Sequence, residues 1–196
     1  MTEERRAKVE SLIEKRQGGL TVIVEDVTNP HNIAAIIRSC DAFGVQSIQV
    51  VDSSGKWTDF LRVGRDSSSS ANRWVDVIYH ESIDACAETL HAEGYEIIAT
   101  VLSEKTENIF EADLSGQIVA ILIGNEHSGA SERAKKLADR ALMVPMRGMI
   151  QSLNVSVCAA ICLFEIVRQR GNDERFVDLN LREKLTERFI PKEATR

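Results

Sequence analysis

Polar side chains capable of chemistry are concentrated in three segments of this sequence. The segments are residues 29–38, 123–132 and 144–154, and each lies at the end of an apolar run of the kind that forms a buried strand. In open α/β sheets, ligands bind at the carboxyl ends of the strands. The three segments are therefore expected to meet in one pocket at that edge.

The first segment opens a helix and offers groups that bind phosphate or ribose. Pro30 suits the first turn of a helix, and Asn32 and His31 lie close to the helix start. Arg38 falls off the apolar face of this helix and, taken alone, is typical of a solvated arginine. With Asn and His at a helix N-terminus, the segment could instead hold an anionic or sugar group. The apolar face is formed by Ile33, Ile36, Ile37 and Cys40.

The second segment places one glutamate in a glycine-bearing loop. Glu126 lies between Gly124 and Gly129, directly after an apolar run. Glycine allows the backbone to approach a ligand closely. The structural alternative is a turn whose glutamate caps neighbouring amides. The sequence contains neither a Walker lysine pattern nor Gly-x-Gly-x-x-Gly, so common nucleoside-triphosphate and dinucleotide sites are disfavoured.

The third segment leads into a helix with no charged side chain between Leu153 and Phe164. Such a helix is expected to be buried on all sides, which would hold the preceding loop rigidly. Ser152 is placed to cap this helix, and Asn154 could satisfy backbone donors of its first turn in the same way. Capping alone would explain both residues, whereas three converging loops would make them part of a site.

The elements that position these segments alternate between strand and helix, which predicts α/β architecture with a mainly parallel sheet and helices on both faces. The expected strands are 20–24, 47–51, 74–79, 95–102, 117–123 and 141–145. The expected helices are 3–16, 30–43, 82–91, 130–137, 153–169 and 179–189. Residues 53–73, with serines at 67–70, and residues 103–116 are expected to be connectors.

Composition bounds the class of protein. The 196 residues carry a formal net charge of −6, which argues weakly against a nucleic-acid partner. The two ends, 1–18 and 168–196, together carry +3, so they and selected arginines must make any contact with a polyanion. The apolar runs are too short to cross a bilayer and no signal region is present, so a cytoplasmic location is expected.

The four cysteines show no paired framework spacing, and free thiols are expected. Cys158 and Cys162 are four residues apart on a predicted helix and could form a metal pair, but no further ligands lie nearby, so no metal is expected.

Together the segments resemble the three signature motifs of the SpoU (TrmH-like) branch of the SPOUT RNA 2′-O-methyltransferases. The similar stretches are 29–38, 121–131 and 144–156, in order and within residues 20–170. The Arg168-Gln-Arg170 ending and the short terminal helices resemble members that methylate a D-loop guanosine of tRNA, at position eighteen. The resemblance implies a homodimer that binds S-adenosyl-L-methionine in a C-terminal trefoil knot at about 117–170. It implies a methyltransferase domain at 19–170, flanked by helical extensions at 1–18 and 171–196.

The resemblance also implies roles for individual residues. The implied catalytic residues are Arg38, Asn32, Glu126, Ser152 and Asn154. The implied cofactor-binding residues are Leu102, Gly124, Met146 and Leu153. The implied RNA-contacting residues are His31, Arg168 and Arg170. Alternatives are methylation of another tRNA site or of rRNA, and an inactive RNA-binding module with the same fold.

Overall fold

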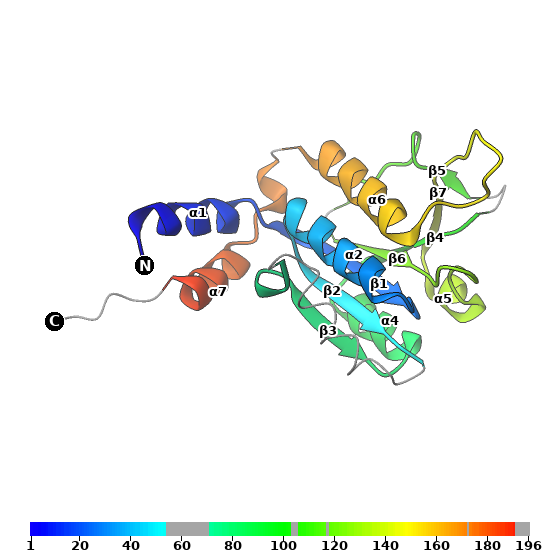
Figure 1. Cartoon of the computed structure of the whole chain (residues 1–196), viewed down its shortest axis with the longest axis horizontal. Coiled ribbons are helices and arrows are strands. Elements are labelled where there is room, and N and C mark those ends of the chain that lie inside the picture. Colours follow the sequence, from blue (N-terminus) through cyan, green and yellow to red (C-terminus); the bar gives the residue numbers. More distant parts are fainter. Residues whose placement is uncertain (54–70, 103–105, 117, 172, 191–196) are drawn as a thin grey trace.

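The computed structural model of this chain describes residues 1–53, 71–102, 106–116, 118–171 and 173–190. Its centre is a parallel seven-stranded sheet with the strand order β3-β2-β1-β6-β4-β7-β5 (Figure 1). The strands are β1 (Gln17–Glu25), β2 (Val45–Val51), β3 (Asp76–His80), β4 (Glu96–Thr100), β5 (Glu107–Asn108), β6 (Val119–Ile123) and β7 (Arg140–Met143). The parallel α/β class predicted from the sequence is confirmed.

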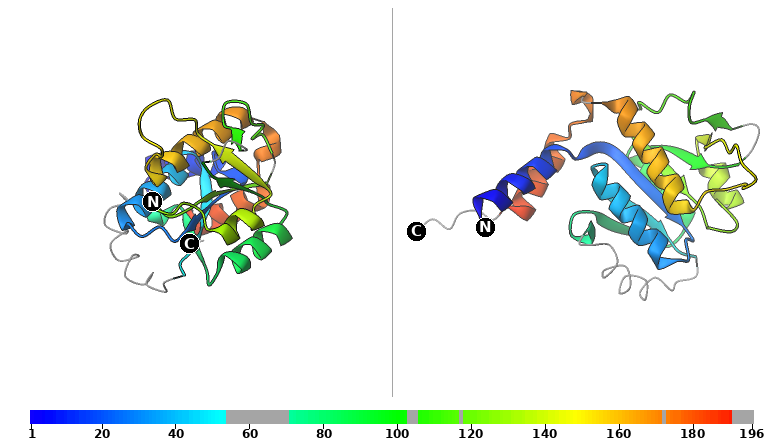
Figure 2. Two further views of the ribbon diagram at one scale, coloured as in Figure 1. Left: turned by 90° about the vertical axis from the view of Figure 1, so that its right-hand side faces the viewer. Right: turned by 45° about the horizontal axis from the view of Figure 1, so that its top comes forward.

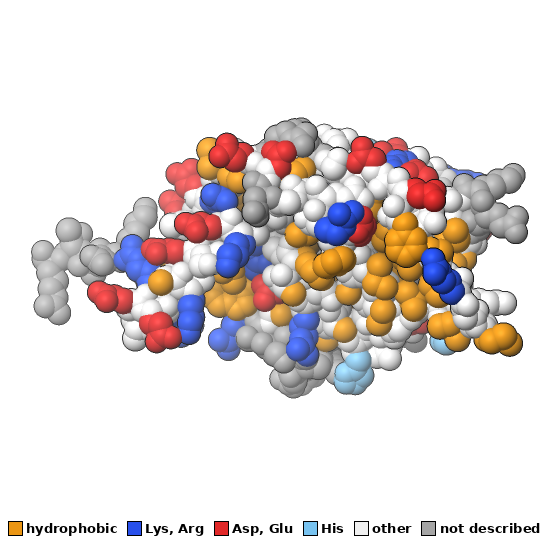
Figure 3. Space-filling view, turned by 90° about the horizontal axis from the view of Figure 1, so that it is seen from above, with side chains coloured by type: hydrophobic (Ala, Val, Ile, Leu, Met, Phe, Trp, Pro, Cys, Tyr) orange, Lys and Arg blue, Asp and Glu red, His pale blue; other side chains and the backbone are white. Residues whose placement is uncertain are grey.

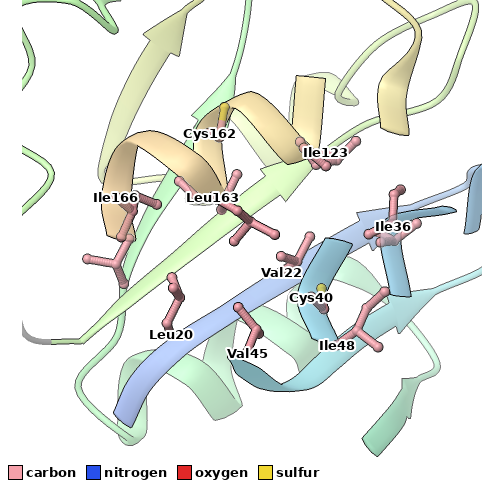
Figure 4. Close-up of a cluster of buried hydrophobic side chains, with 14 of the residues drawn as sticks. Leu20, Val22, Ile36, Cys40, Val45, Ile48, Ile123, Cys162, Leu163 and Ile166 are labelled. Carbon is pink, nitrogen blue, oxygen red and sulfur yellow. The ribbon is translucent and has the colours of Figure 1, made fainter. Parts of the chain in front are cut away.

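Helices cover both faces of the sheet because each carries one apolar face. The helices are α1 (Glu3–Glu14), α2 (Pro30–Ala42), α4 (Ile83–Ala92), α5 (Glu132–Leu137), α6 (Val155–Arg170) and α7 (Leu179–Phe189), with short 3-10 turns η1 (Ala71–Arg73) and η2 (Glu174–Phe176). Side chains of α2 and α6 share one buried cluster with β1, β2 and β6 (Figure 4). Side chains of α4 and α5 form a second cluster with β1, β4 and β6 on the opposite face.

The first and last helices pack on each other, away from the sheet (Figure 2). Val9 and Ile13 of α1 are buried together with Leu185 of α7, and Trp74 packs against this cluster. Within the described residues, none of the helices combines the length and the apolar character needed to span a membrane.

Several boundaries differ from the sequence prediction for local reasons. The expected first helix ends at Glu14, and Gly18 and Gly19 lie within β1 instead of closing the helix. The expected connector 103–116 contains the two-residue edge strand β5, which is too short to give a periodic signal. Most of the expected loop 53–73, including Ser67–Ser70, lies outside the described residues.

Helix α6 is not buried on all sides, so that expectation is wrong for the single chain. Ala159, Cys162 and Leu163 face the sheet and have no exposed area. Val157 and Phe164 lie on the opposite face and are 46% and 55% exposed. Viewed from the side on which α6 lies, hydrophobic side chains gather in a broad patch (Figure 3). The apolar helix therefore has an inner face in the core and an outer face on the surface.

Candidate active site

Neighbouring strands bring the predicted segments to one edge of the sheet. β1 and β6 are adjacent and parallel, with Val24 paired to Ile123, so the segments that follow them begin at the same level. β6 is next to β4, which is next to β7. The loop before α6 follows β7 and reaches the same edge, as the switch-point rule for open sheets predicts.

Glu126 joins the first two segments. Its Oε1 accepts hydrogen bonds from the Asn29 backbone N (3.0 Å) and from Asn32 Nδ2 (2.9 Å). Its Oε2 accepts from the backbone N (3.1 Å) and hydroxyl (3.3 Å) of Thr28. Burial raises the pKa of this carboxyl, but the hydrogen bonds from Asn32, Asn29 and Thr28 together outweigh it, so the pKa is lowered. Glu126 is therefore an anionic anchor at neutral pH.

Asn154 joins the third segment to the other two. Its Nδ2 donates to Asn32 Oδ1 over 3.0 Å, while its Oδ1 accepts from the Ser156 backbone N at 2.9 Å and caps α6. A chain of side chains thus runs from Glu126 through Asn32 to Asn154. Asn32 is buried, and these two hydrogen bonds hold its amide at both ends. The proposed capping role belongs to Asn154, and the expectation that Ser152 caps this helix is wrong because α6 begins at Val155.

The backbone after β6 folds back tightly, which requires glycine at position 124. Asn125 and Gly129 exchange two backbone hydrogen bonds of 3.0 Å across the loop. A Cβ at Gly124 would lie 2.1 Å from the backbone N of Ala130, so any other residue must open the loop. This close approach fixes the direction in which Glu126 leaves the strand.

A cavity of about 350 Å³ lies beside this network. It is bounded by the ends of β4, β6 and β7, by the loop after β6 and by the start of α6. The four residues predicted to bind the cofactor all line it, namely Leu102, Gly124, Met146 and Leu153. Glu126 and Ser152 are also on its wall. Apolar side chains from the strand ends and from the start of α6 share the lining with polar groups of the loops, and such a mixture suits a ligand with apolar and polar parts.

Arg38 does not line this cavity in the single chain. Its side chain is exposed on α2, six residues beyond Asn32, or about 9 Å along the helix axis. It adjoins Ala35 and Ser39, which border a groove between α2 and α6. His31 is exposed in the first turn of α2. Arg38 is thus placed at the edge of an apolar surface rather than inside the pocket of its own chain.

The two arginines at the end of α6 differ in environment. Arg168 is exposed and forms an ion pair with Glu165, with an Nη2–Oε1 distance of 2.6 Å. Arg170 is 2% exposed, donates to the carbonyl oxygens of Gly18, Gly19 and Gly116, and stacks on Phe176. In this conformation the guanidinium of Arg170 is occupied inside the protein, which disfavours the RNA contact predicted for it.

Sequence reasoning missed two contacts that hold the loops together. Thr28 gives Glu126 two of its hydrogen bonds but precedes the polar segment. Glu25, buried at the end of β1, accepts from the backbone N (2.9 Å) and hydroxyl (2.6 Å) of Ser131. A glutamate that ends an apolar strand was the available signal, since a buried carboxylate needs such partners.

A parallel α/β sheet with polar loops and a cavity at the carboxyl ends of its strands is typical of ligand-binding proteins, although the first predicted segment lies beside the cavity and does not line it. Comparisons with known proteins identify the family. The sequence profile of the SpoU rRNA Methylase family matches residues 19–164. The chain belongs to this family.

Individual relatives and solved structures agree with this assignment. A tRNA (guanosine(18)-2′-O)-methyltransferase of Thermus thermophilus is 41% identical over 86% of this chain and 84% of its own length. The crystal structure of the Aquifex aeolicus TrmH/SpoU tRNA modifying enzyme superposes with a TM-score of 0.84 at 30% identity, covering 95% of this chain and 94% of that one. The SpoU methyltransferase AviRb from Streptomyces viridochromogenes, solved in complex with AdoMet, has a TM-score of 0.67 at 29% identity and covers 82% of this chain and 61% of that one.

Proposed function

We propose that this protein transfers a methyl group from S-adenosyl-L-methionine to a ribose 2′-hydroxyl in tRNA, at the D-loop guanosine in position eighteen. The observation that carries the proposal is the chain of hydrogen bonds from Glu126 through Asn32 to Asn154 along the rim of the cavity. The relative that is 41% identical, and whose name specifies guanosine 18, supports the choice of substrate.

The size of the cavity and the residues that line it support its assignment to the methyl donor. Gly124, Met146 and Leu153 offer apolar surface and backbone groups for an adenosine, and a volume of about 350 Å³ suits one small ligand. When bound, S-adenosyl-L-methionine supplies a methyl group activated on a sulfonium centre. Ser152 stands on the wall of the cavity and would help to orient the donor.

The chain's own residues would then position the acceptor. The network of Glu126, Asn32 and Asn154 holds three loops in fixed relation, so a ribose docked at the rim meets a preorganised surface. Arg38 would orient the ribose and stabilise negative charge that develops on its oxygen. A guanidinium remains protonated in proteins, so Arg38 acts as a charged donor and not as the base.

The position of Arg38 supports a site shared between two copies of the chain. The groove beside it is lined by apolar side chains of α2 and α6, including Val157 and Phe164. A second copy seated there would bury this face, and by two-fold symmetry each Arg38 would face the neighbouring copy. We therefore propose a homodimer in which Arg38 completes the cavity of its partner.

The remaining proposals concern the chain path and the RNA. We assign residues 19–170 to the methyltransferase domain, with a trefoil knot at about 117–170, and residues 1–18 and 171–196 to helical extensions. The proposed RNA-contacting groups are His31 and Arg168, both exposed. Arg170 is left out because it is buried.

The test is methylation of an unmodified tRNA transcript with labelled methyl donor, followed by mapping of the modified nucleotide. The matched control is a transcript with adenosine in place of the D-loop guanosine. Arg38→Ala should lower turnover by about 10²-fold or more while changing cofactor affinity little, since charge-stabilising groups contribute on this scale. Methylation of rRNA or of another tRNA site would overturn the assignment of the D-loop guanosine as the substrate. Cofactor binding without methylation of any RNA would favour an inactive RNA-binding module.

A further inference from the structure

One of the four cysteines differs from the others in its surroundings. Cys40, Cys86 and Cys162 are completely buried, and Cys162 lies among the core side chains under α6 (Figure 4). Cys158 is partly exposed and lines the 350 Å³ cavity beside Gly124 and Leu153. It is therefore the one cysteine of the chain that a solute entering the cavity can reach.

The neighbours of Cys158 favour its thiolate form. A hydrogen bond from the Cys162 thiol is the main cause of a lowered pKa at Cys158, and burial opposes it. Cys158 lies in the first turns of α6, where the helix dipole stabilises an anion.

The other thiols are poorly reactive by the same criteria. Burial raises the pKa of Cys40 and of Cys86 to about 12 in each case. The hydrogen bond to Cys158 and burial both raise the pKa of Cys162. Thiolate, not thiol, is the nucleophile, so accessibility and ionisation select the same residue.

Two other uses of the Cys158–Cys162 pair fit the geometry less well. Side chains four apart on a helix have Cβ atoms roughly 5–6 Å apart, which is wider than the roughly 3.5–4.5 Å of a disulfide. Within the described residues, no group of three or more His, Cys, Asp or Glu is arranged to hold a metal ion. The pair is therefore best described as two free thiols whose pKa values shift in opposite directions.

We propose that Cys158 is a site of reversible covalent modification by small disulfides, and that the resulting mixed disulfide closes the cavity to the methyl donor. The Cys158 thiolate attacks one sulfur of the reagent, a new S–S bond forms, and the reagent's S–S bond breaks to release one thiolate. One disulfide is consumed and one is made, so no further oxidant is needed. A second thiol reverses the step.

The size of the cavity explains the effect on binding. About 350 Å³ is near the lower end of ligand pockets, so an adduct on its wall competes directly with an adenosine. This half of the proposal rests on the proposed function, because it takes the cavity as the methyl-donor site. The reactivity of Cys158 does not depend on that assignment.

The test treats the native full-length protein with bis(hydroxyethyl) disulfide and maps the adducts by mass spectrometry over time. Cys158 should be modified about tenfold faster, or more, than the other three cysteines. S-adenosylhomocysteine should slow that modification, and the adduct should weaken binding of S-adenosylhomocysteine by about tenfold or more, with recovery after dithiothreitol. Equal rates of modification at all four cysteines would overturn the proposal that Cys158 is a selective site. An adduct on Cys158 that leaves the affinity for S-adenosylhomocysteine unchanged would overturn the proposal that it closes the cavity.

Matched variants separate this proposal from the proposed function. For Cys158→Ser, treated and untreated samples should bind S-adenosylhomocysteine equally, whatever the affinity of the variant. Cys162→Ala should slow modification at Cys158 because it removes the thiol that donates the hydrogen bond, whereas Cys40→Ala should not. If untreated wild-type protein fails to bind S-adenosylhomocysteine, the proposed function fails, and the adduct map still decides whether Cys158 is selective.

Discussion

Replacing Glu126 by Gln tests whether one carboxylate holds the loops of the site together. The carboxylate accepts hydrogen bonds from Asn29, Asn32 and Thr28 at 2.9–3.1 Å. A glutamine keeps only one acceptor oxygen, so its NH₂ group must face a backbone N–H. The bonds that remain change from charged to neutral, and each loses about 1 kcal/mol. Because Glu126 is only partly buried and solvent screens its charge, we expect a total loss of about 2 kcal/mol.

The assay is urea unfolding at fixed protein concentration, with Glu88→Gln as the matched control. Glu88 is exposed on α4, and its variant should change the free energy of unfolding by less than about 0.5 kcal/mol. For Glu126→Gln, a loss of about 2 kcal/mol corresponds to a fall in Tm of roughly 4–8 °C for a chain of this size. The Gln variant should also lose methyl transfer to tRNA, because the rim of the cavity is no longer held.

The pH dependence has a definite sign. The pKa of Glu126 is lowered in the folded protein from its ordinary value of 4.5. Its contribution to stability is therefore complete above about pH 4.5 and is lost as pH falls through the lower folded pKa. The stability gap between wild type and Glu126→Gln should be constant from about pH 7 to about pH 5 and shrink below that. A gap that is absent at neutral pH, or that widens on acidification, would refute the anchoring role.

Three further substitutions test other parts of the structure. Gly124→Ala should destabilise the fold by about 2 kcal/mol or more in thermal unfolding, since the new Cβ meets backbone; an unchanged Tm would contradict the tight turn. Arg170→Met should cost about 3 kcal/mol by leaving three carbonyl groups without their donor, with RNA contacts affected only through unfolding; a well-folded variant with weaker RNA binding would restore the RNA role. Phe164→Glu should give a monomer in light scattering, whereas Phe110→Glu, at another exposed phenylalanine, should not; a dimer in both would place the interface elsewhere.

Regular elements with clear end signals are predictable from the sequence. The last helix is predicted at 179–189 and is observed there, because its apolar spacing is helical and Asp178 caps it. The start of α2 follows from the Asn-Pro pair at 29–30. Strand alternation predicts that the three segments lie at one edge of the sheet, since parallel strands end at one edge. That the first two segments meet depends also on the adjacency of β1 and β6, which alternation does not give.

The sequence does not show which side of a helix faces the core and which side faces the surface. Arg168 and Arg170 are two residues apart, which is a rotation of about 200° on a helix, so they face opposite ways. The sequence shows that both residues are positively charged, but it does not show that Arg170 is the one that contacts β1. The absence of charge between Leu153 and Phe164 likewise predicts an apolar surface, but it does not distinguish the face of α6 in the core from the face that carries Phe164.

Structural and functional roles coincide in the polar residues at the rim of the cavity. Asn154 caps α6 with its oxygen and holds Asn32 with its nitrogen, while Glu126 satisfies backbone amides and the same asparagine. The sequence presents helix capping and a role in the site as alternatives for these residues. In the structure, the amide of Asn154 and the carboxylate of Glu126 each do both. Because the same bonds secure the fold and fix the rim, a fall in activity after substitution has a catalytic meaning only when stability is measured on the same variant.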